Sequence, residues 1–219
     1  MTVVAYRRLQ DFDLRAIDLA VKQRYIPEGE ITAREGTKEY VRSFHAHMQI
    51  RWMLMEYYRI MPAAVWAVPP QNDPEHYYKS CHVIIDREES GRPVLVSPAG
   101  FHLSITHGGK MVACALSTDT PVGLDVQPIG KIAPRVLEKL YTENEREYVG
   151  RDPERFTEIW TRKESFVKMT GTGITRDISV IDTLTGENTN GAVFTTKRIG
   201  KKYLTLCTEK AVDVVFDGR

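Results

Sequence analysis

The fold class of this chain is decided by residues 101–116, FHLSITHGGKMVACAL. Residues 101–106 alternate between apolar and polar, and 111–116 are apolar on both faces, so we expect two antiparallel strands with the second one buried. Between them, residues 107–110, HGGK, predict a four-residue hairpin loop. Hairpins of this kind, rather than single parallel strands, alternate with the expected helices. This favours an α+β fold over a doubly wound sheet.

The other elements are predicted from the spacing of apolar residues. Helices are expected at 13–25, 38–60, 133–150 and 154–170. Strands are expected at 65–68, 82–85, 122–127, 178–182, 192–199 and 203–208. The short polar stretch at 118–121 is the best candidate for a boundary, so we predict two halves, 1–118 and 119–219.

Composition excludes several classes of protein. The 219 residues hold 30 Lys and Arg against 29 Asp and Glu, so a strongly basic chain held to nucleic acid by its overall charge is excluded. None of the three cysteines belongs to a C-x-x-C pair, which speaks against a disulfide scaffold or a cysteine zinc site. No apolar run is long enough for a signal peptide or a membrane span. We therefore expect a cytoplasmic monomer that uses neither nucleic acid nor membrane.

The expected strand at 122–127, VGLDVQ, is interrupted by polar residues. Alternation places its three apolar residues on one face and Gly123, Asp125 and Gln127 on the other. Side chains two residues apart on one face are about 7 Å apart, so a carboxylate and an amide oxygen here suit a hard cation such as Mg²⁺. The alternative is the solvated face of an edge strand, which spacing alone favours.

The expected helix at 154–170 also carries charges close to its apolar stripe. Trp160, Glu164 and Lys168 follow one another at intervals of four, and Lys163 lies on the neighbouring row. Such charges are costly unless they are paired or bound to a ligand. The alternative is a surface Glu–Lys pair that supports the helix by only about 0.3 kcal/mol. Together, the strand acid, the helix acid and the lysine one turn later would hold Mg²⁺ and a diphosphate.

Residues 122–126, VGLDV, resemble the V/I-G-I/V-D signature of 4′-phosphopantetheinyl transferases, and 160–168, WTRKESFVK, resemble their W-x-x-K-E-A/S-x-x-K signature. Glu164 follows Asp125 by 39 residues, a separation similar to that of the longer, surfactin-synthetase-activating branch. Two weaker matches lie upstream: residues 91–93, GRP, resemble a G-K/R-P turn, and residues 103–107, LSITH, resemble a strand that ends in S-H-S.

This resemblance implies a pseudo-dimer of two similar α+β halves with coenzyme A in the cleft between them. It implies transfer of 4′-phosphopantetheine from coenzyme A to a serine of an apo acyl or peptidyl carrier protein, with release of adenosine 3′,5′-bisphosphate. The implied cofactor is Mg²⁺. The alternative is a non-enzymatic module that binds coenzyme A or a carrier protein and has a degenerate metal site.

The resemblance also implies roles for individual residues. Asp125 and Glu164 match the Mg²⁺ ligands, and Lys168 would neutralise charge on the leaving phosphate. Lys163 matches the motif lysine near the phosphates. Glu145, in residues 141–145, YTENE, resembles a glutamate that would accept the proton of the carrier serine.

The nucleotide side of the implied site comes from the two upstream matches. The turn Gly91-Arg92-Pro93 would lie near the nucleotide, and His107 would meet the 3′-phosphate. Thr106 stands where the family has a serine beside this histidine. The alternative for His107 is a packed core histidine, because strand alternation groups it with Leu103 and Ile105.

Two further features bear on the implied function. Gln127 stands where many relatives have a third acid, so we expect weaker Mg²⁺ binding before coenzyme A arrives. The basic cluster at 197–202, KRIGKK, is either a solvated hairpin turn or a surface for an acidic carrier protein.

Overall fold

The computed structural model describes residues 1–9, 25–27, 29–62, 80–173 and 178–218. The strand expected at 65–68, and the helix expected at 13–25 except for its last residue, lie outside the described residues. None of the helices in this described part is long and apolar enough to cross a membrane.

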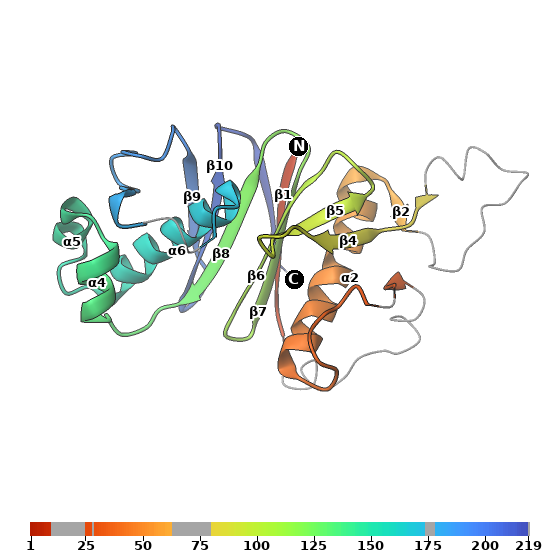
Figure 1. Cartoon of the computed structure of the whole chain (residues 1–219), viewed down its shortest axis with the longest axis horizontal. Coiled ribbons are helices and arrows are strands. Elements are labelled where there is room, and N and C mark those ends of the chain that lie inside the picture. Colours follow the sequence, from red (N-terminus) through yellow and green to blue (C-terminus); the bar gives the residue numbers. More distant parts are fainter. Residues whose placement is uncertain (10–24, 28, 63–79, 174–177, 219) are drawn as a thin grey trace, which may run out of the picture.

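The elements form a mixed α+β fold in which two sheets pack face to face between helices (Figure 1). The first sheet has the strand order β11-β1-β7-β6 and consists of β11 (Val214–Gly218), β1 (Thr2–Arg8), β7 (Met111–Ser117) and β6 (His102–Gly108). The second has the order β8-β10-β9 and consists of β8 (Val122–Pro128), β10 (Lys202–Thr208) and β9 (Val193–Arg198). Apolar residues of both sheets share one core, formed by Val4, Met111, Ala113, Ala115, Val122, Leu124, Val126, Leu204 and Leu206.

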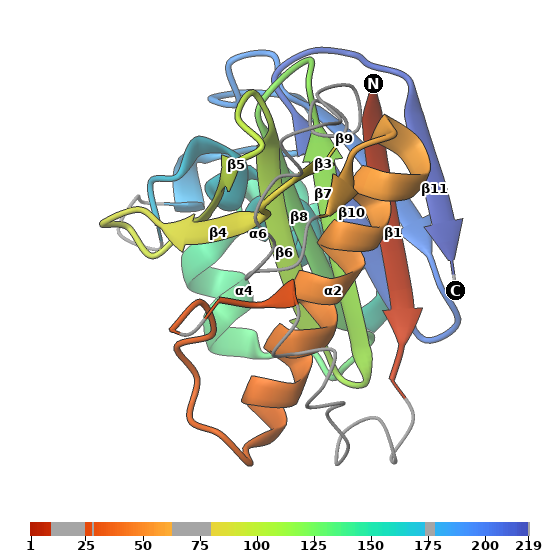
Figure 2. The same ribbon diagram turned by 90° about the vertical axis from the view of Figure 1, so that its right-hand side faces the viewer.

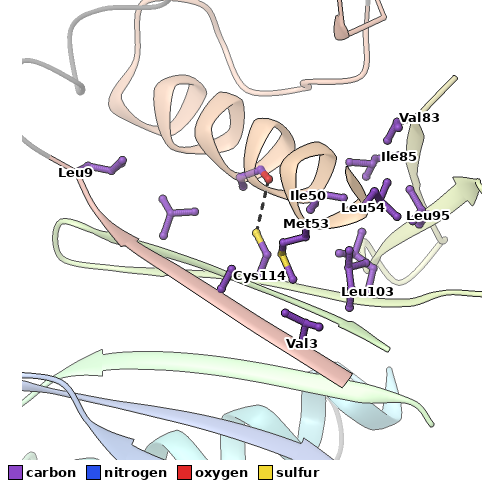
Figure 3. Packing of buried hydrophobic residues seen from close by; sticks show 14 residues of the cluster. Val3, Leu9, Ile50, Met53, Leu54, Val83, Ile85, Leu95, Leu103 and Cys114 are labelled. Carbon is purple, nitrogen blue, oxygen red and sulfur yellow. Dashed lines mark hydrogen bonds between the residues drawn. The ribbon is translucent and has the colours of Figure 1, made fainter. Parts of the chain in front are cut away.

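Helix α2 (Lys38–Tyr58) covers the outer face of the first sheet (Figure 2). Its first turn is capped by Thr37, whose hydroxyl accepts a hydrogen bond from the backbone N–H of Tyr40, so a local signal sets the start of the helix. Ile50, Met53 and Leu54 on its buried face pack against the sheet (Figure 3). The helix expected at 38–60 is confirmed.

Helix α6 (Pro153–Thr170) covers the outer face of the second sheet and confirms the helix expected at 154–170. Asp152 caps its N-terminus by accepting from the backbone N–H groups of Glu154 and Arg155, and Gly171 ends it with a left-handed conformation at φ 68°. The helix lies very close to β8, because a Cβ atom added at Gly123 would stand 1.9 Å from the carbonyl oxygen of Ser165.

Smaller elements complete the two layers. The hairpin of β4 (Ile84–Arg87) and β5 (Pro93–Ser97) lies beside β6, and β2 (Met61–Pro62) pairs with β3 (Ser80–Cys81). The helical stretch expected at 133–150 is two helices, α4 (Pro134–Leu140) and α5 (Glu143–Val149), because Thr142 caps a new helix after Tyr141.

Three further features of the structure differ from the sequence-based prediction. His107 and Gly108 continue β6, so the loop between β6 and β7 is the two residues Gly109 and Lys110 rather than four. The strand expected at 178–182 is a short 3-10 turn, Ile178–Val180, whose neighbouring carbonyl groups accept hydrogen bonds from the Lys163 ammonium group instead of from a strand. Strand β11 has no counterpart in the sequence-based prediction, and it pairs in parallel with β1.

Candidate active site

The candidate site forms where the edge strand of one sheet meets the edge strand of the other, at β6 and β8. The hydroxyl of Ser104 accepts a hydrogen bond from the backbone N–H of Leu124 at 2.9 Å. Further along, a Cβ atom at Gly108 would stand 2.3 Å from the carbonyl oxygen of Val126, so the two backbones nearly touch. This contact brings polar side chains of β6 to the polar face of β8.

Asp125 is the centre of the resulting polar cluster. It is only 2 % exposed, although its strand lies at the edge of a sheet. Its Oδ1 atom lies 2.6 Å from Nζ of Lys168 and accepts from the hydroxyl of Thr106 at 3.3 Å. Its Oδ2 atom accepts from the side-chain amide of Gln127 at 3.2 Å. The face of β8 that carries Asp125 is therefore a buried polar cluster and not a solvated strand face.

Glu164 lies one helical turn before Lys168 on α6 and is partly buried. Burial raises the pKa of its carboxyl group above the ordinary value, and the negative charge of Asp125 raises it further, while Lys168 acts in the opposite direction. Two carboxylates that repel each other in a partly dry site favour a cation between them. The side-chain amide of Gln127 contacts Asp125 through its nitrogen and also carries an oxygen, so these residues fit the chemistry of a Mg²⁺ site.

Few side chains at this site could coordinate a metal ion. Among residues 1–9, 25–27, 29–62, 80–173 and 178–218, there is no group of three or more His, Cys, Asp and Glu side chains arranged to hold a metal ion. Asp125 and Glu164 contribute two acids, and Gln127, at the position where the sequence resemblance implies a third acid, is neutral. Any metal held here would therefore depend on ligand oxygens from elsewhere to complete its shell.

Glu164 and Lys168 line a cavity of about 310 Å³ whose wall combines residues of the β4–β5 hairpin, β6 and α6. Its opposite wall is the β4–β5 turn, where Gly91, Arg92 and Pro93 lie together. Gly91 adopts φ 82°, a conformation that favours glycine. Arg92 donates to the carbonyl oxygen of Met169 at 3.3 Å and pairs with Glu88 at 3.0 Å, so it joins this turn to the end of α6.

A second cavity of about 360 Å³ adjoins the first and shares Arg87, Pro93 and Ile105 with it. Its wall includes His107 and Arg42. His107 lies on the exposed side of β6, so the packed core histidine is wrong. Partial enclosure lowers the pKa of its imidazole, and the positive charges of Arg42 and Lys168 lower it further, against a small opposite effect of Glu39.

The structure places Glu145 and Lys163 elsewhere. Their side chains are fully buried and form an ion pair at 2.8 Å inside the second half of the chain. Lys163 also donates to the carbonyl oxygens of Ile178 and Ile181, and Glu145 accepts from the backbone and hydroxyl of Thr183. This placement does not support the expected contact of Lys163 with phosphates or the expected proton transfer by Glu145, because both side chains are fully buried and neither lines one of the two cavities.

Some residues of the two cavities have no counterpart in the sequence-based site. Arg42, on the first turns of α2, donates to the carbonyl oxygen of Gly109 at 2.9 Å and lies on the wall of the second cavity, as do Arg34 and Arg87. Arg42 and Arg34 belong to the first 80 residues, where no motif was matched. The only signal in the sequence is a basic residue at the start of an otherwise apolar helix, which is common in solvated helices.

Fold and site together define an α+β protein with a carboxylate and lysine cluster at the mouth of a basic cavity, a type of site that suits a phosphorylated ligand. Residues 121–215 match the family model of the 4′-phosphopantetheinyl transferase superfamily, so this part of the chain is similar to that superfamily.

Individual 4′-phosphopantetheinyl transferases are similar to parts of this chain. Over 102 residues the chain is 32 % identical to 4′-phosphopantetheinyl transferase psf-1 of Bacillus pumilus, an alignment that covers 44 % of this chain and 43 % of psf-1. It is 27 % identical to 4′-phosphopantetheinyl transferase Sfp of Bacillus subtilis (strain 168) over 40 % of this chain and 41 % of Sfp. It is 28 % identical to 4′-phosphopantetheinyl transferase AcpT of Salmonella typhi over 57 % of this chain and 73 % of AcpT. The matched region thus spans less than half the length of psf-1 and Sfp.

Proposed function

We propose that this protein is a Mg²⁺-dependent 4′-phosphopantetheinyl transferase. It transfers 4′-phosphopantetheine from coenzyme A to a serine of an apo acyl or peptidyl carrier protein and releases adenosine 3′,5′-bisphosphate. The observation that supports this most is the cluster of Asp125, Glu164 and Lys168 at the mouth of the cavity between the two halves. The match of residues 121–215 to the superfamily model supports the same reaction.

In this proposal Asp125 and Glu164 hold Mg²⁺, and Gln127 offers a neutral oxygen or a hydrogen bond to a metal-bound water. When bound, Mg²⁺ would neutralise charge on the pyrophosphate of coenzyme A. Lys168 leaves Asp125 for the phosphate that departs with the nucleotide, because a charge-assisted bond to a developing negative charge stabilises the transition state. Asp125 is then available to the cation.

The chemistry needs one bond to form and one to break. The serine oxygen of the carrier attacks the phosphorus that carries pantetheine, the bond from that phosphorus to the bridging oxygen breaks, and the bridging oxygen leaves with the nucleotide. The serine proton needs an acceptor. Glu164 is better placed for this role than Glu145, because Glu164 lines the cavity whereas Glu145 is fully buried.

The second cavity would take the nucleotide. Gly91, Arg92 and Pro93 line the first cavity and Pro93 also lines the second, so this turn would flank the nucleotide. The hydroxyl of Thr106, which contacts Asp125 and Lys168, would lie at the pyrophosphate end. The lowered pKa keeps His107 neutral near pH 7, so its imidazole would donate a hydrogen bond to a phosphate and become charged as the phosphate binds. Arg42 would add a permanent positive charge there.

We also propose that the fold is a pseudo-dimer with halves 1–118 and 119–219 and with coenzyme A between them. Two features support this arrangement. Each half places one long helix, α2 or α6, on the outer face of its own sheet. The cavity that holds Glu164 and Lys168 is lined by residues from both halves.

The test is to incubate the protein with coenzyme A, Mg²⁺ and a panel of apo carrier proteins, and to measure the mass of each carrier. At least one carrier should gain phosphopantetheine. The variant Glu164→Gln should lose roughly a hundred- to a thousandfold in rate while its circular dichroism stays unchanged. If no carrier gains mass under any condition, the proposed transfer is wrong.

The low negative charge of the possible metal ligands supports a second candidate function. Lys168 already neutralises Asp125, and Gln127 replaces an acid, so the site carries little net negative charge for a metal. A module that binds coenzyme A or a carrier without chemistry would have this character. Tight binding of coenzyme A in calorimetry, together with no carrier modification at high Mg²⁺, would select this function.

A further inference from the structure

The turns at one end of the two sheets bring basic residues together from distant parts of the chain. Figure 1 shows the β6–β7 turn, the β9–β10 turn and the ends of β1 and β8 at the lower edge of the sheets. The backbone N–H of Leu9 donates to the carbonyl oxygen of Lys110, and that of Ile129 donates to the carbonyl oxygen of Lys201. A Cβ atom at Gly109 would lie 3.4 Å from Cε of Lys202, so the two turns are in contact.

We name this surface the basic edge and define it by Arg8, Lys110, Lys131, Lys201 and Lys202. All five carry positive charge, and all except the partly buried Lys202 are exposed. Within the described part of the chain, neither Lys201 nor Lys202 forms an ion pair, whereas the neighbouring Arg198 pairs with Glu154 at 2.7 Å.

The charge of the basic edge is local. The whole chain carries a net charge of only +1, so the positive charge of the basic edge is a local feature and not a property of the whole molecule. Such an asymmetric distribution steers a partner of opposite charge to one place on the surface, even when the overall attraction is weak.

The position of the basic edge relative to the candidate site is the second argument. Lys202 pairs with Pro128 across β10 and β8, and Asp125 lies three residues earlier on the same strand. At about 3.3 Å per residue, the backbone of Pro128 is therefore about 10 Å from that of Asp125. Neither cavity of the candidate site includes a residue of the basic edge in its wall, so coenzyme A would leave this surface open.

From these observations we infer that the basic edge is the docking surface for an apo carrier protein whose acidic side chains surround its reactive serine. The inference rests on the proposed function, because that function is what requires a protein substrate next to Asp125. An acidic protein fits better than a nucleic acid, since nucleic-acid binding relies on neutralising many phosphates, whereas the net charge here is close to zero.

The test measures binding separately from chemistry. A fluorescently labelled acidic apo carrier is titrated with the full-length protein, and binding is followed by anisotropy at low and at high salt. The triple variant Lys110→Glu/Lys201→Glu/Lys202→Glu should bind about ten- to a hundredfold more weakly than the wild type at low salt, with little further loss at high salt. The matched control Lys139→Glu/Arg151→Glu/Lys210→Glu makes the same change in charge at exposed positions elsewhere and should bind within about threefold of the wild type.

Coenzyme A affinity, measured by calorimetry, should be the same in all three proteins, which shows that the site is intact. Three results overturn the inference: a wild-type protein that binds no acidic carrier, a triple variant that binds as tightly as the wild type, or a control that weakens equally. Preferential binding of duplex DNA by the wild type would also overturn it.

If the carrier binds in a charge-dependent way but gains no mass, the proposed function fails while the docking surface stands. If the carrier gains mass and the triple variant binds the carrier as tightly as the wild type, the proposed function stands and the docking surface is wrong.

Discussion

At the scale of single residues, Glu164 should set the pH dependence of the site. Burial and Asp125 raise the pKa of its carboxyl group, so the folded protein holds this proton more tightly than the unfolded chain does. A cation needs the deprotonated form. Mg²⁺ affinity, measured by titration in the presence of coenzyme A, should therefore rise with pH as Glu164 loses its proton, over a range above that of an ordinary glutamate.

The raised pKa of Glu164 also affects folding stability, which should fall as the pH rises while Mg²⁺ affinity increases. The pKa of the Glu164 carboxyl group is higher in the folded protein than in the unfolded chain. Below the unfolded-state pKa the group is protonated in both states and does not affect stability. As the pH rises through the folded-state pKa, the ionised group increasingly destabilises the folded protein. Glu164→Gln should accordingly raise the urea midpoint at pH 7 and leave it unchanged near pH 4. A variant that is less stable than the wild type at pH 7 would show that Glu164 is held by contacts rather than strained by repulsion.

The buried pair of Lys163 and Glu145 leads to a different prediction. Both side chains are fully buried, so removing one charge leaves the other without its partner in a dry environment. Glu145→Gln should lower the free energy of unfolding by about 3–5 kcal/mol, measured by urea denaturation. The double variant Lys163→Met/Glu145→Gln should recover much of this loss. A single variant of unchanged stability would contradict the structural role and reopen the question of a catalytic one.

At the scale of elements, the contact between β8 and α6 depends on Gly123. The missing side chain lets the backbones of Ser165 and Met169 approach, and it also brings Glu164 and Lys168 to Asp125. Gly123→Ala should push α6 away, destabilise the protein by about 1–3 kcal/mol and weaken Mg²⁺ binding. The matched control is Gly130→Ala, where the nearest atom to an added Cβ is 3.8 Å away. Equal effects of both variants on Mg²⁺ binding would contradict this positioning role.

The elements also show where sequence reasoning succeeds and where it fails. The bounds of α2 and α6 are predicted well because the spacing of their apolar residues is a local signal. The structure shows that their ends are also set locally, by caps at Thr37 and Asp152 and by Gly171. Strand β11 was not predicted, since its partner β1 lies at the other end of the chain and nothing nearby marks the pairing. The strand expected at 178–182 fails because its carbonyl groups bond to Lys163, a tertiary contact that periodicity does not contain.

The candidate site also has a part that the sequence predicts and a part that depends on tertiary packing. Alternation along β8 and the four-residue spacing along α6 place Asp125, Glu164 and Lys168 on faces that can meet, and the structure brings Asp125 and Lys168 into contact. The same spacing says nothing of Arg42, which reaches the second cavity only through the packing of α2 on the first sheet. The spacing also does not show that Lys163 and Lys168 have different environments. Lys163 is fully buried, whereas Lys168 lines a cavity.

At the scale of the whole molecule, the two halves share one core. Val4, Met111, Ala113 and Ala115 of the first sheet pack against Val122, Leu124, Val126, Leu204 and Leu206 of the second. Strand β11 lies in the predicted second half, 119–219, but completes the sheet of the first. The boundary at 118–121 therefore separates the chain in sequence, while the packing joins the two parts into one unit.

We accordingly expect that residues 1–118 and 119–219, produced separately, do not fold on their own. Leu204 and Leu206 are fully buried, and exposing each costs about 1.5–3 kcal/mol, so opening the shared core removes an amount comparable with the 5–15 kcal/mol that stabilises a typical domain. Amide NMR spectra of each fragment should show poor dispersion, and neither should give a cooperative urea transition, whereas the full chain should unfold in one step. A fragment 119–219 with a cooperative transition of its own would show that the shared core is an interface between two independent domains, and that coenzyme A would bind between bodies free to move.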